Sequence, residues 1–515
     1  MRLALVLAAV AALVGSISGR AAEGQRLPLG RSGLMETRET LELAPGVEHT
    51  RIVRGEQLAT DVWTVEVAFV ATRRDARLLS ARLRTDGFAP RTVRVATNAP
   101  DDLEGSELGH LVRAGAFASV EEANALRDRL AAAGYTGLRV IYTGEDGRAT
   151  SGPWVVNVLR VDPERFDGAV LPELGTEIVP GLERLSEIAA RTDALAAING
   201  GYFVIGAADG TPGDLAGLSV IDGTVVSEAV NGRTSLVLPS ASGEGASIVA
   251  LASRQVATAS DGATRELDGL NRAPGLVRGC GGSGGDLPTE SPLHDFTCTD
   301  ASELVQLTSI FFGPVSLPGA GVEAVLDASG AVLALRESRG GPIPFLGSVL
   351  VGTGDAADWL REHARLGARI EAGVELVADG SPLAFGEELG VVNGGPRLLR
   401  GGEPEITAGA EGFDGASRSE FYYRFGVRRN PRTLAGITAD GHLVLVAVDG
   451  RAPGHSVGAS FEESALVLQA LGAVDGVNLD GGGSTALTVG TALVNRPSDA
   501  TGERPIGDAI VLLPD

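Results

Sequence analysis

The chain has 515 residues, which is enough for two to four domains of ordinary size. Its formal net charge of −23 argues against binding to a nucleic-acid backbone. All 43 basic residues are arginine, because the sequence contains no lysine, so a lysine Schiff base and a P-loop lysine are excluded. The 72 glycines indicate a protein rich in turns and in β-structure.

The N-terminus predicts export. A basic start is followed by an unbroken apolar run from Leu3 to Val14 and then by small residues up to Ala22. The run is too short to span a bilayer, so we interpret residues 1–22 as a signal peptide, with an uncleaved anchor as the alternative. No later segment is long and apolar enough to predict a transmembrane helix.

The chain contains two cysteines, Cys280 and Cys298. In an oxidising compartment we expect them to form one disulfide. The alternative is a metal site that also uses His294, which lies between them.

An internal repeat follows a polar segment. Residues 23–60 show little periodicity, which is typical of a linker or a weak strand pair. Residues 75–88 and 122–135 then repeat the same pattern of Ala, Leu, Arg, Gly and aromatic positions at helical spacing. Each copy has a predicted strand on either side: Trp63 to Phe69, Arg91 to Val95, Leu111 to Phe117 and Gly137 to Tyr142. Two such units predict a small ferredoxin-like βαββαβ domain over residues 61–143.

The second copy carries a family resemblance. The stretch from Val112 to Ser119, followed by a helix that ends at Ala133-Gly134-Tyr135, resembles the sporulation-related repeat (SPOR) family. Domains of that family bind peptidoglycan glycan strands that lack stem peptides, so the resemblance implies these strands as a partner. A generic spacer of the same fold is the alternative.

Residues 144–153 are rich in turn formers and mark a boundary. From 154 to 515 short β-branched strands alternate with glycine-rich turns, and helices are predicted only near 181–191, 301–308, 356–366 and 461–471. The last helix is best signalled, because Ser460 and Glu463 form a capping box. The pattern predicts an α+β domain with a mostly antiparallel sheet and helices on one side.

Three glycine-centred turns follow apolar strands in this domain. They are Asn199-Gly200-Gly201, Asn393-Gly394-Gly395 and Asp480-Gly481-Gly482-Gly483-Ser484. Consecutive glycines let the backbone approach a ligand and offer N–H groups to an anion. Any one of them alone would be interpreted as a hairpin turn, but three together favour a site.

An arginine cluster lies between the second and third turns. It runs from Arg428 through Asn430 to Arg432 and Thr433, at the start of a predicted strand. Arginine can bind phosphate bidentately, and a threonine adds a hydroxyl donor. The alternative is a solvated run of charge, above all for Arg428 and Arg429.

These motifs together resemble the phosphodiester glycosidase family. The resemblance covers roughly residues 185–515 and rests on Asn199-Gly200-Gly201-Tyr202-Phe203, on Pro431-Arg432-Thr433 and above all on the stretch from Asn478 to Thr485. Many members have His where this chain has Asn430, which puts any proton transfer at that position in doubt. The family cleaves the C1–O bond of a sugar whose leaving group is a phosphate monoester.

The resemblance implies roles for particular residues. Arg432 would hold the phosphate, with Thr433, Gly481, Gly482 and Ser484 as further contacts. A carboxylate is needed at the oxocarbenium-like centre as base or nucleophile, with Asp480 as the first choice and Asp214 as the second. Sugar contacts are assigned to Asn199, Gly200, Asn393 and Gly394.

Two other functions stay open at this point. One is a metal-dependent phosphodiesterase that uses Asp480 and Asp449 as oxygen ligands and breaks the P–O bond. The other is a non-catalytic protein that binds polysaccharide. No cofactor is certain and a divalent metal stays open, although the histidines show no zinc-site spacing. His455 is the one histidine in a segment of catalytic character, and its alternative is an ordinary loop residue.

Overall fold

The computed structural model describes residues 25–95, 108–230, 232–279, 285–289, 297–311, 319–384, 386–413 and 419–515. The predicted signal peptide, Cys280 and His294 lie outside these ranges. In the described part of the chain, no helix combines the length and the apolar character needed to cross a membrane.

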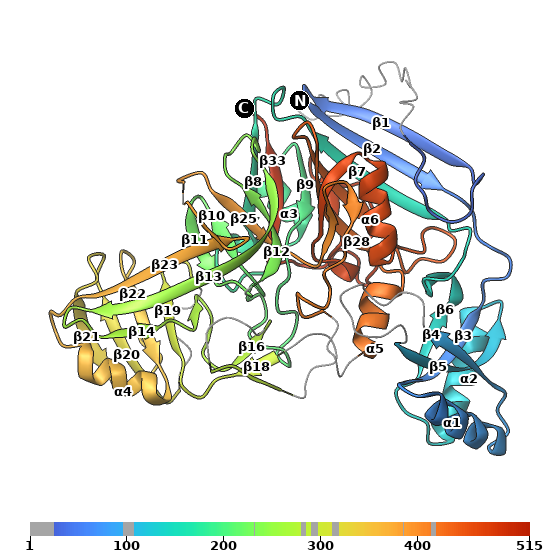
Figure 1. Cartoon of the computed structure of the whole chain (residues 1–515), viewed down its shortest axis with the longest axis horizontal. Coiled ribbons are helices and arrows are strands. Elements are labelled where there is room, and N and C mark those ends of the chain that lie inside the picture. Colours follow the sequence, from blue (N-terminus) through green and yellow to red (C-terminus); the bar gives the residue numbers. More distant parts are fainter. Residues whose placement is uncertain are drawn as a thin grey trace, which may run out of the picture.

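The first of the large sheets joins distant parts of the sequence (Figure 1). All of its strand pairs are antiparallel. In spatial order its strands are β1 (Glu36–Ala44), β2 (Val47–Arg54), β7 (Trp154–Val161), β29 (Leu443–Val448), β28 (Arg432–Thr438), β30 (Ala473–Asn478), β26 (Arg397–Arg400) and β27 (Glu403–Pro404). Residues 36–54 therefore form a strand pair within this sheet, which confirms the strand-pair alternative for residues 23–60, and the linker interpretation is wrong.

The repeat domain is inserted between β2 and β7, which are neighbours in the first sheet. It contains β3 (Trp63–Val70), α1 (Arg73–Thr85), β4 (Pro90–Val95), β5 (Gly109–Phe117), α2 (Val120–Ala132) and β6 (Arg139–Tyr142). These strands pair antiparallel in the order β4-β5-β3-β6. The two helices cover the sheet face that carries Val65 and Val112, and the six elements match those predicted from the repeat.

Two further sheets complete the central body. One has five strands: β32 (Ala492–Leu493), β31 (Leu487–Val489), β9 (Ala196–Asn199), β33 (Asp508–Leu513) and β8 (Ala169–Leu174). The other has β11 (Thr224–Ser227), β10 (Ser219–Ile221), β25 (Gly390–Asn393), β12 (Arg233–Leu238), β13 (Ser247–Ala259), β23 (Ile370–Ala378) and β24 (Ser381–Leu383), with β14 (Thr264–Glu266) on β13. Leu445 of the first sheet, Ile510 of the second and Leu236 of the third share one buried core.

Long strands β13 and β23 lead to an outer lobe (Figure 1). It contains β15 (Gly269–Leu270), β19 (Leu304–Thr308), β22 (Ser348–Gly352), β20 (Val322–Leu326), β21 (Val332–Arg336) and α4 (Gly354–His363). The helix predicted over 301–308 is wrong, because this segment forms β19. Leu304 packs into one core and Val305 into another on the opposite side, which requires the two-residue alternation of a strand.

A small three-stranded sheet lies beside this lobe: β16 (Leu276–Arg278), β18 (Thr297–Thr299) and β17 (Leu287–Pro288). Cys298 is fully buried on β18. Its predicted partner Cys280 lies outside the described residues, so the disulfide stays a prediction.

The remaining helices are α3 (Leu185–Arg191), α5 (Ser419–Tyr422), which continues as a π-helical turn over Tyr423–Val427, and α6 (Phe461–Ala470). The capping box of α6 is present, since the Glu463 backbone N–H donates to Ser460 Oγ at 3.1 Å and the Ser460 N–H donates to Glu463 Oε2 at 3.1 Å. Single turns of 3-10 helix occur at Thr143–Glu145, Gly175–Glu177 and Gly482–Ser484. Mostly antiparallel sheet with few helices confirms the α+β class.

Candidate active site

The ends of β9, β28 and β30 meet, and Asn199 joins them. Its Nδ2 donates to the Asp480 carbonyl oxygen at 2.7 Å. Its Oδ1 accepts from the Thr433 hydroxyl at 2.6 Å and from the Ala486 backbone N–H at 3.1 Å. The first and third glycine turns and the arginine-threonine strand are thereby brought together.

Asn393 fixes the second turn against the first. Its Oδ1 accepts from the Tyr202 N–H at 2.7 Å, and the Tyr202 hydroxyl donates to the Gly395 carbonyl oxygen at 2.7 Å. Asn199, Asn393 and Thr433 are all at least 97% buried. Their polar atoms bond to protein, so they position the turns and do not make the sugar and phosphate contacts expected from the sequence.

Two of the glycines allow close packing beneath the site. A Cβ on Gly200 would come within 2.6 Å of Asp508 Oδ1, and one on Gly394 within 2.8 Å of the Asn478 carbonyl oxygen. Both glycines therefore serve the approach of one strand end to another and do not line the cavity.

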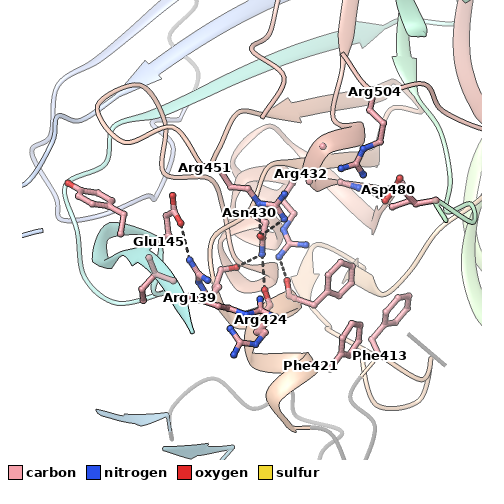
Figure 2. A pocket seen from close by; sticks show the side chains of 18 of the residues that line it. Arg139, Glu145, Phe413, Phe421, Arg424, Asn430, Arg432, Arg451, Asp480 and Arg504 are labelled. Carbon is pink, nitrogen blue, oxygen red and sulfur yellow. Dashed lines mark hydrogen bonds and ion pairs between the residues drawn. The ribbon is translucent and has the colours of Figure 1, made fainter. Parts of the chain in front are cut away.

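A cavity of about 830 Å³ opens above these turns (Figure 2). Its charged lining is strongly biased, with seven arginines against two carboxylates: Arg139, Arg278, Arg424, Arg428, Arg432, Arg451 and Arg504 against Glu145 and Asp480. Aromatic rings complete the wall: Trp63, Tyr142, Tyr202, Phe413, Phe421 and Phe425. In a chain of charge −23 this concentration of positive charge favours an anionic ligand.

Asp480 is the carboxylate at the turn beneath this cavity. Its Oδ1 accepts from the Gly481 N–H at 2.9 Å. Burial raises the pKa of Asp480, and this rise is opposed by the Ser484 hydroxyl and by the charges of Arg504 and Arg278. A carboxylate with a raised pKa beside a cavity has the character of a catalytic base or nucleophile.

The glycine nest is only partly free for a ligand. The Gly481 N–H is bonded to Asp480, and the Gly482 N–H donates to the Pro431 carbonyl oxygen at 2.9 Å. Among the described residues only the Gly483 N–H of this nest has no protein acceptor. Ser484 is buried and its Oγ accepts from Arg504 Nη1 at 3.4 Å.

Two arginines lie over the nest, and sequence analysis gave neither a role. A Cβ on Gly482 would come within 3.2 Å of Arg451 Nη2, and one on Gly483 within 2.1 Å of Arg504 Nη2. Arg504 is paired with Asp499 at 2.7 Å. No motif marks either arginine in the sequence, where Arg451 follows Asp449-Gly450 and Arg504 precedes Pro505.

Arg451 is held by an amide instead of a carboxylate. Its Nη2 donates to Asn430 Oδ1 at 3.0 Å, while Asn430 Nδ2 donates to the carbonyl oxygens of Arg424 and Arg428 at 3.0 and 3.1 Å. The two carbonyls fix the orientation of the amide. Burial lowers the pKa of Arg451. The Asn430 amide is neutral, so it does not balance the positive charge of Arg451. Asn430 thus orients the cation of Arg451.

Arg432 lies in the wall of the cavity and is 1% exposed. Its Nε donates to the Ala459 carbonyl oxygen at 3.0 Å and its Nη2 donates to that of Phe425. The guanidinium carbon lies 4.4 Å from the Phe461 ring centroid. Burial lowers the pKa of Arg432 to about 10. The Nε–Nη2 edge of Arg432 is therefore used within the protein, and only the Nη1 hydrogens and the second Nη2 hydrogen remain for a ligand.

Asp508, at the start of β33, is a carboxylate that sequence analysis missed. It is 1% exposed, and its Oδ1 accepts from the Gly201 N–H at 2.8 Å. Its buried Oδ2 has no hydrogen-bond partner in the part of the chain that the structure describes. Burial raises the pKa of Asp508 to about 7, and the charge of Asp480 contributes to this rise. No local motif marks this residue, because only the pairing of β33 with β9 brings it to the site.

Asp214, the second choice for the catalytic carboxylate, lies outside the cavity. It borders a separate small cavity together with Glu228 and Arg272. Burial and then the charge of Glu228 raise its pKa well above the usual range. This placement removes Asp214 from the candidate site.

Asp449 and His455 also lie outside the lining. His455 Nε2 is 2.7 Å from Asp449 Oδ2, and Asp449 Oδ1 accepts from Asn495 Nδ2 at 3.2 Å and from the Arg496 N–H at 2.9 Å. Within the described ranges, no group of three or more His, Cys, Asp or Glu side chains is arranged to hold a metal ion.

The repeat domain contributes to the cavity through Trp63 and the strand β6. It is joined to the central body by buried charges. Arg113 is 1% exposed and donates to Asp146 Oδ1 at 2.7 Å, to Glu66 Oε2 at 3.1 Å and to the Tyr423 hydroxyl at 3.0 Å. Glu66 also pairs with Arg424 at 2.7 Å.

Arg428 and Arg429 belong to the same interface. Arg428 pairs with Glu145 at 2.9 Å, and Arg429 pairs with Glu463 at 2.6 Å and donates to the Gly144 carbonyl oxygen at 2.9 Å. The alternative that these two arginines form a solvated charge run is therefore wrong.

Models of two known families match two separate parts of the chain. The phosphodiester glycosidase family model matches residues 324–513, which include Asp480 and Arg432, and the SPOR domain model matches residues 59–140. No curated protein matches the chain.

Three solved structures are similar to the chain. A Burkholderia pseudomallei protein whose name describes it as exported is 38% identical over 95% of this chain and 99% of its own, with a TM-score of 0.87. A hypothetical Synechocystis protein is 18% identical over 94% of this chain and 80% of its own, with a TM-score of 0.54, and shares the fold. The catalytic domain of zebrafish N-acetylglucosamine-1-phosphodiester alpha-N-acetylglucosaminidase is 13% identical over 83% of this chain and 84% of its own, with a TM-score of 0.35. The chain belongs to the family of the Burkholderia pseudomallei protein, and it combines a phosphodiester glycosidase domain with a SPOR domain.

Proposed function

We propose that the protein is a hydrolase that cleaves the C1–O bond of a sugar-1-phosphodiester in the cell envelope. One observation carries the proposal: a cavity lined by seven arginines and two carboxylates, one of which is Asp480 at the end of β30. The phosphodiester glycosidase family model supports it, because its match over residues 324–513 includes Asp480 and five of the seven arginines.

Bond cleavage needs two things from this site. The C1–O electron pair leaves with the phosphate monoester, so positive charge must be placed around its oxygens. Arg451, Arg504 and the Gly483 N–H are suited to contact the phosphate, while Arg432 adds charge from the wall. The oxygen of a water molecule ends on C1, and Asp480 acts as the base that takes its proton or as the nucleophile that precedes it.

Asp508 acts as a positioning residue for Asp480. The Asp480 N–H donates to the Gly200 carbonyl oxygen at 3.2 Å, and the Gly200 N–H donates to the Asp508 carbonyl oxygen at 3.0 Å. A neutral Asp508 side chain leaves the negative charge on Asp480, where the anomeric centre needs it.

We also propose export and attachment to the wall. The name of the Burkholderia pseudomallei relative and the peptidoglycan binding of SPOR domains support an envelope location after removal of residues 1–22. The strand order β4-β5-β3-β6 with two crossover helices supports a ferredoxin-like SPOR fold that binds peptide-free glycan strands.

The test is incubation with a sugar-1-phosphodiester, with and without chelator, followed by product analysis. We expect free reducing sugar and a phosphate monoester. Asp480→Asn should lower kcat about a thousandfold, because it keeps the shape and removes the charge. The control Asp128→Asn changes a carboxylate that is 69% exposed on α2 and should behave as wild type. Sugar 1-phosphate as product would indicate a phosphodiesterase, and binding without turnover would indicate a non-catalytic protein.

A further inference from the structure

The cavity offers many hydrogen-bond donors and few acceptors. Its seven arginines only donate, and Glu145 and Asp480 carry the only carboxylates among the described residues of the lining. Apart from the tyrosines, the one neutral polar side chain among those residues is Asn430, and its amide is used within the protein. The Tyr202 hydroxyl also bonds to protein, since it donates to the Gly395 carbonyl oxygen. A phosphodiester accepts without donating and fits this balance, whereas a chain of hydroxyl groups, which must also donate, does not.

An apolar wall lies beside these arginines. The Phe425 ring stacks on two others, with centroids 5.8 Å from Phe413 and 5.3 Å from Phe421. Phe421 and Phe425 are half-buried, and Ile205, which lines the same cavity, is 49% exposed. Figure 2 shows Phe413 and Phe421 together on one side of the cavity. These side chains offer hydrocarbon surface and no hydrogen bond to a ligand.

Arg432 connects the cations to this wall. Its guanidinium carbon lies 5.3 Å from the Phe425 ring centroid, and its Nη2 donates to the Phe425 carbonyl oxygen. Burial lowers the pKa of Arg432, and the nearby positive charge of Arg451 adds to this effect. A phosphate held by these two cations is therefore within reach of the wall, and an alcohol esterified to that phosphate can pack against the rings.

We propose that this alcohol is apolar, so that the substrate is a lipid-linked sugar-1-phosphate. Its hydrocarbon packs on Phe413, Phe421, Phe425 and Ile205. Hydrolysis releases the free sugar, with the water oxygen on C1, and an alkyl phosphate that keeps the electron pair of the broken C1–O bond. The substrate class rests on the proposed function, whereas the apolar subsite beside the phosphate does not.

Calorimetry on the full-length protein tests the subsite without turnover. The probes are octyl phosphate and glycerol phosphate, which carry the same phosphate group on an apolar and on a hydroxylated alcohol. We expect wild type to bind octyl phosphate about a hundredfold more tightly, because the burial of about four methylenes is enough for this ratio. Phe421→Asn should reduce the preference about tenfold and Ile205→Ser about threefold. Both variants should bind glycerol phosphate as wild type does.

The matched control is Phe345→Ser, which changes a phenylalanine that is 84% exposed between β21 and β22, outside the cavity lining, and should keep the full preference. Equal binding of the two probes by wild type would overturn the proposal. An unchanged preference in Phe421→Asn and Ile205→Ser, with both variants unfolding at the wild-type temperature, would also overturn it.

Hydrolysis assays separate this inference from the proposed function. The substrates are one sugar-1-phosphate esterified through its phosphate either to octanol or to glycerol, and we expect kcat/KM to be about a hundredfold higher for the octyl ester. Turnover of both esters with equal kcat/KM would refute the substrate class and leave the proposed function standing. Absence of turnover with a retained preference for octyl phosphate would refute the proposed function and leave the apolar subsite standing.

Discussion

Arginines at the domain interface and arginines in the cavity differ in their partners. The interface set, Arg113, Arg424, Arg428 and Arg429, is paired with carboxylates throughout. Of the seven arginines that line the cavity, Arg424 and Arg428 belong to this interface set, and Arg278 and Arg504 pair with Asp209 and Asp499. The other three, here called the cavity set, have no carboxylate partner among the described residues: Arg139, Arg432 and Arg451. The first set satisfies its charge within the protein, whereas the second keeps its charge for a ligand.

The pKa values follow the same division. Burial would lower the pKa of Arg113, but its bonds to Asp146 and the charge of Glu66 raise it instead. Burial lowers the pKa of Arg139, Arg432 and Arg451, and no carboxylate reverses the change. In a chain whose cations are all arginine, the partner and not the residue type separates structural from ligand-binding positions.

The largest expected effect is on stability at the interface. Arg113→Met should lower the free energy of unfolding by about 3–5 kcal/mol, because Asp146 would stay buried without its arginine and Glu66 would keep only Arg424. Chemical denaturation measures this loss. Arg127→Met on α2, where the arginine is 41% exposed, is the control and should change it by less than about 0.5 kcal/mol. Equal losses in both variants would contradict a structural role for the interface set.

The next effect is on binding in the cavity. Arg451→Gln should raise KM for a sugar-1-phosphodiester about tenfold and leave the unfolding free energy unchanged, because the lost charge has no carboxylate partner. Arg432→Lys should also raise KM and lower kcat. With an aryl glycoside, whose leaving group is uncharged, both variants should keep nearly the wild-type KM and kcat. Arg400→Gln, paired with Glu405 at the surface, is the control. Equal loss on charged and uncharged substrates would show that these arginines are structural.

The smallest effect extends the comparison to carboxylates. Arg113 and Arg424 lower the pKa of Glu66 against the effect of burial, whereas Asp508 has no such partner among the described residues and its pKa is raised to about 7. The folded protein therefore holds the Asp508 proton over a range where the unfolded chain, with a pKa of about 3.9, has lost it. Stability from this group is present at low pH and falls by about 1.4 kcal/mol per pH unit between pH 5 and 7.

Asp508→Asn should remove this dependence of the unfolding free energy on pH. The control is Asp358→Asn, which changes a carboxylate that is 76% exposed on α4 and should retain the dependence. Unfolding free energies measured at three pH values decide between these outcomes. An unchanged slope in Asp508→Asn would mean that its carboxylate is ionised in the folded protein.

Local signals in the sequence predicted the elements that local interactions determine. The capping box of α6 and the repeated strand-helix-strand units were both found from spacing alone. The motifs also identified Asp480 and Arg432 as residues at the cavity.

Long-range pairing explains what the sequence did not show. β2 pairs with β7 across the whole SPOR domain, so the place of residues 36–54 in the first sheet could not be predicted from local spacing. Asp508 and Asp214 carry the same side chain at turns beside strands, and only the pairing of β33 with β9 places one of them behind Asp480. Asn199 and Thr433 looked like ligand contacts because the partners that bury them come from distant strands.

Hydrolysis of a sugar-1-phosphodiester in heavy-oxygen water, with mass spectrometry of both products, tests the central claim most directly. Attack at C1 should place the heavy oxygen in the free sugar and leave the phosphate monoester unlabelled, with the reaction lost in Asp480→Asn. Heavy oxygen in the phosphate would show that the P–O bond breaks, and would contradict a glycosidase site at Asp480.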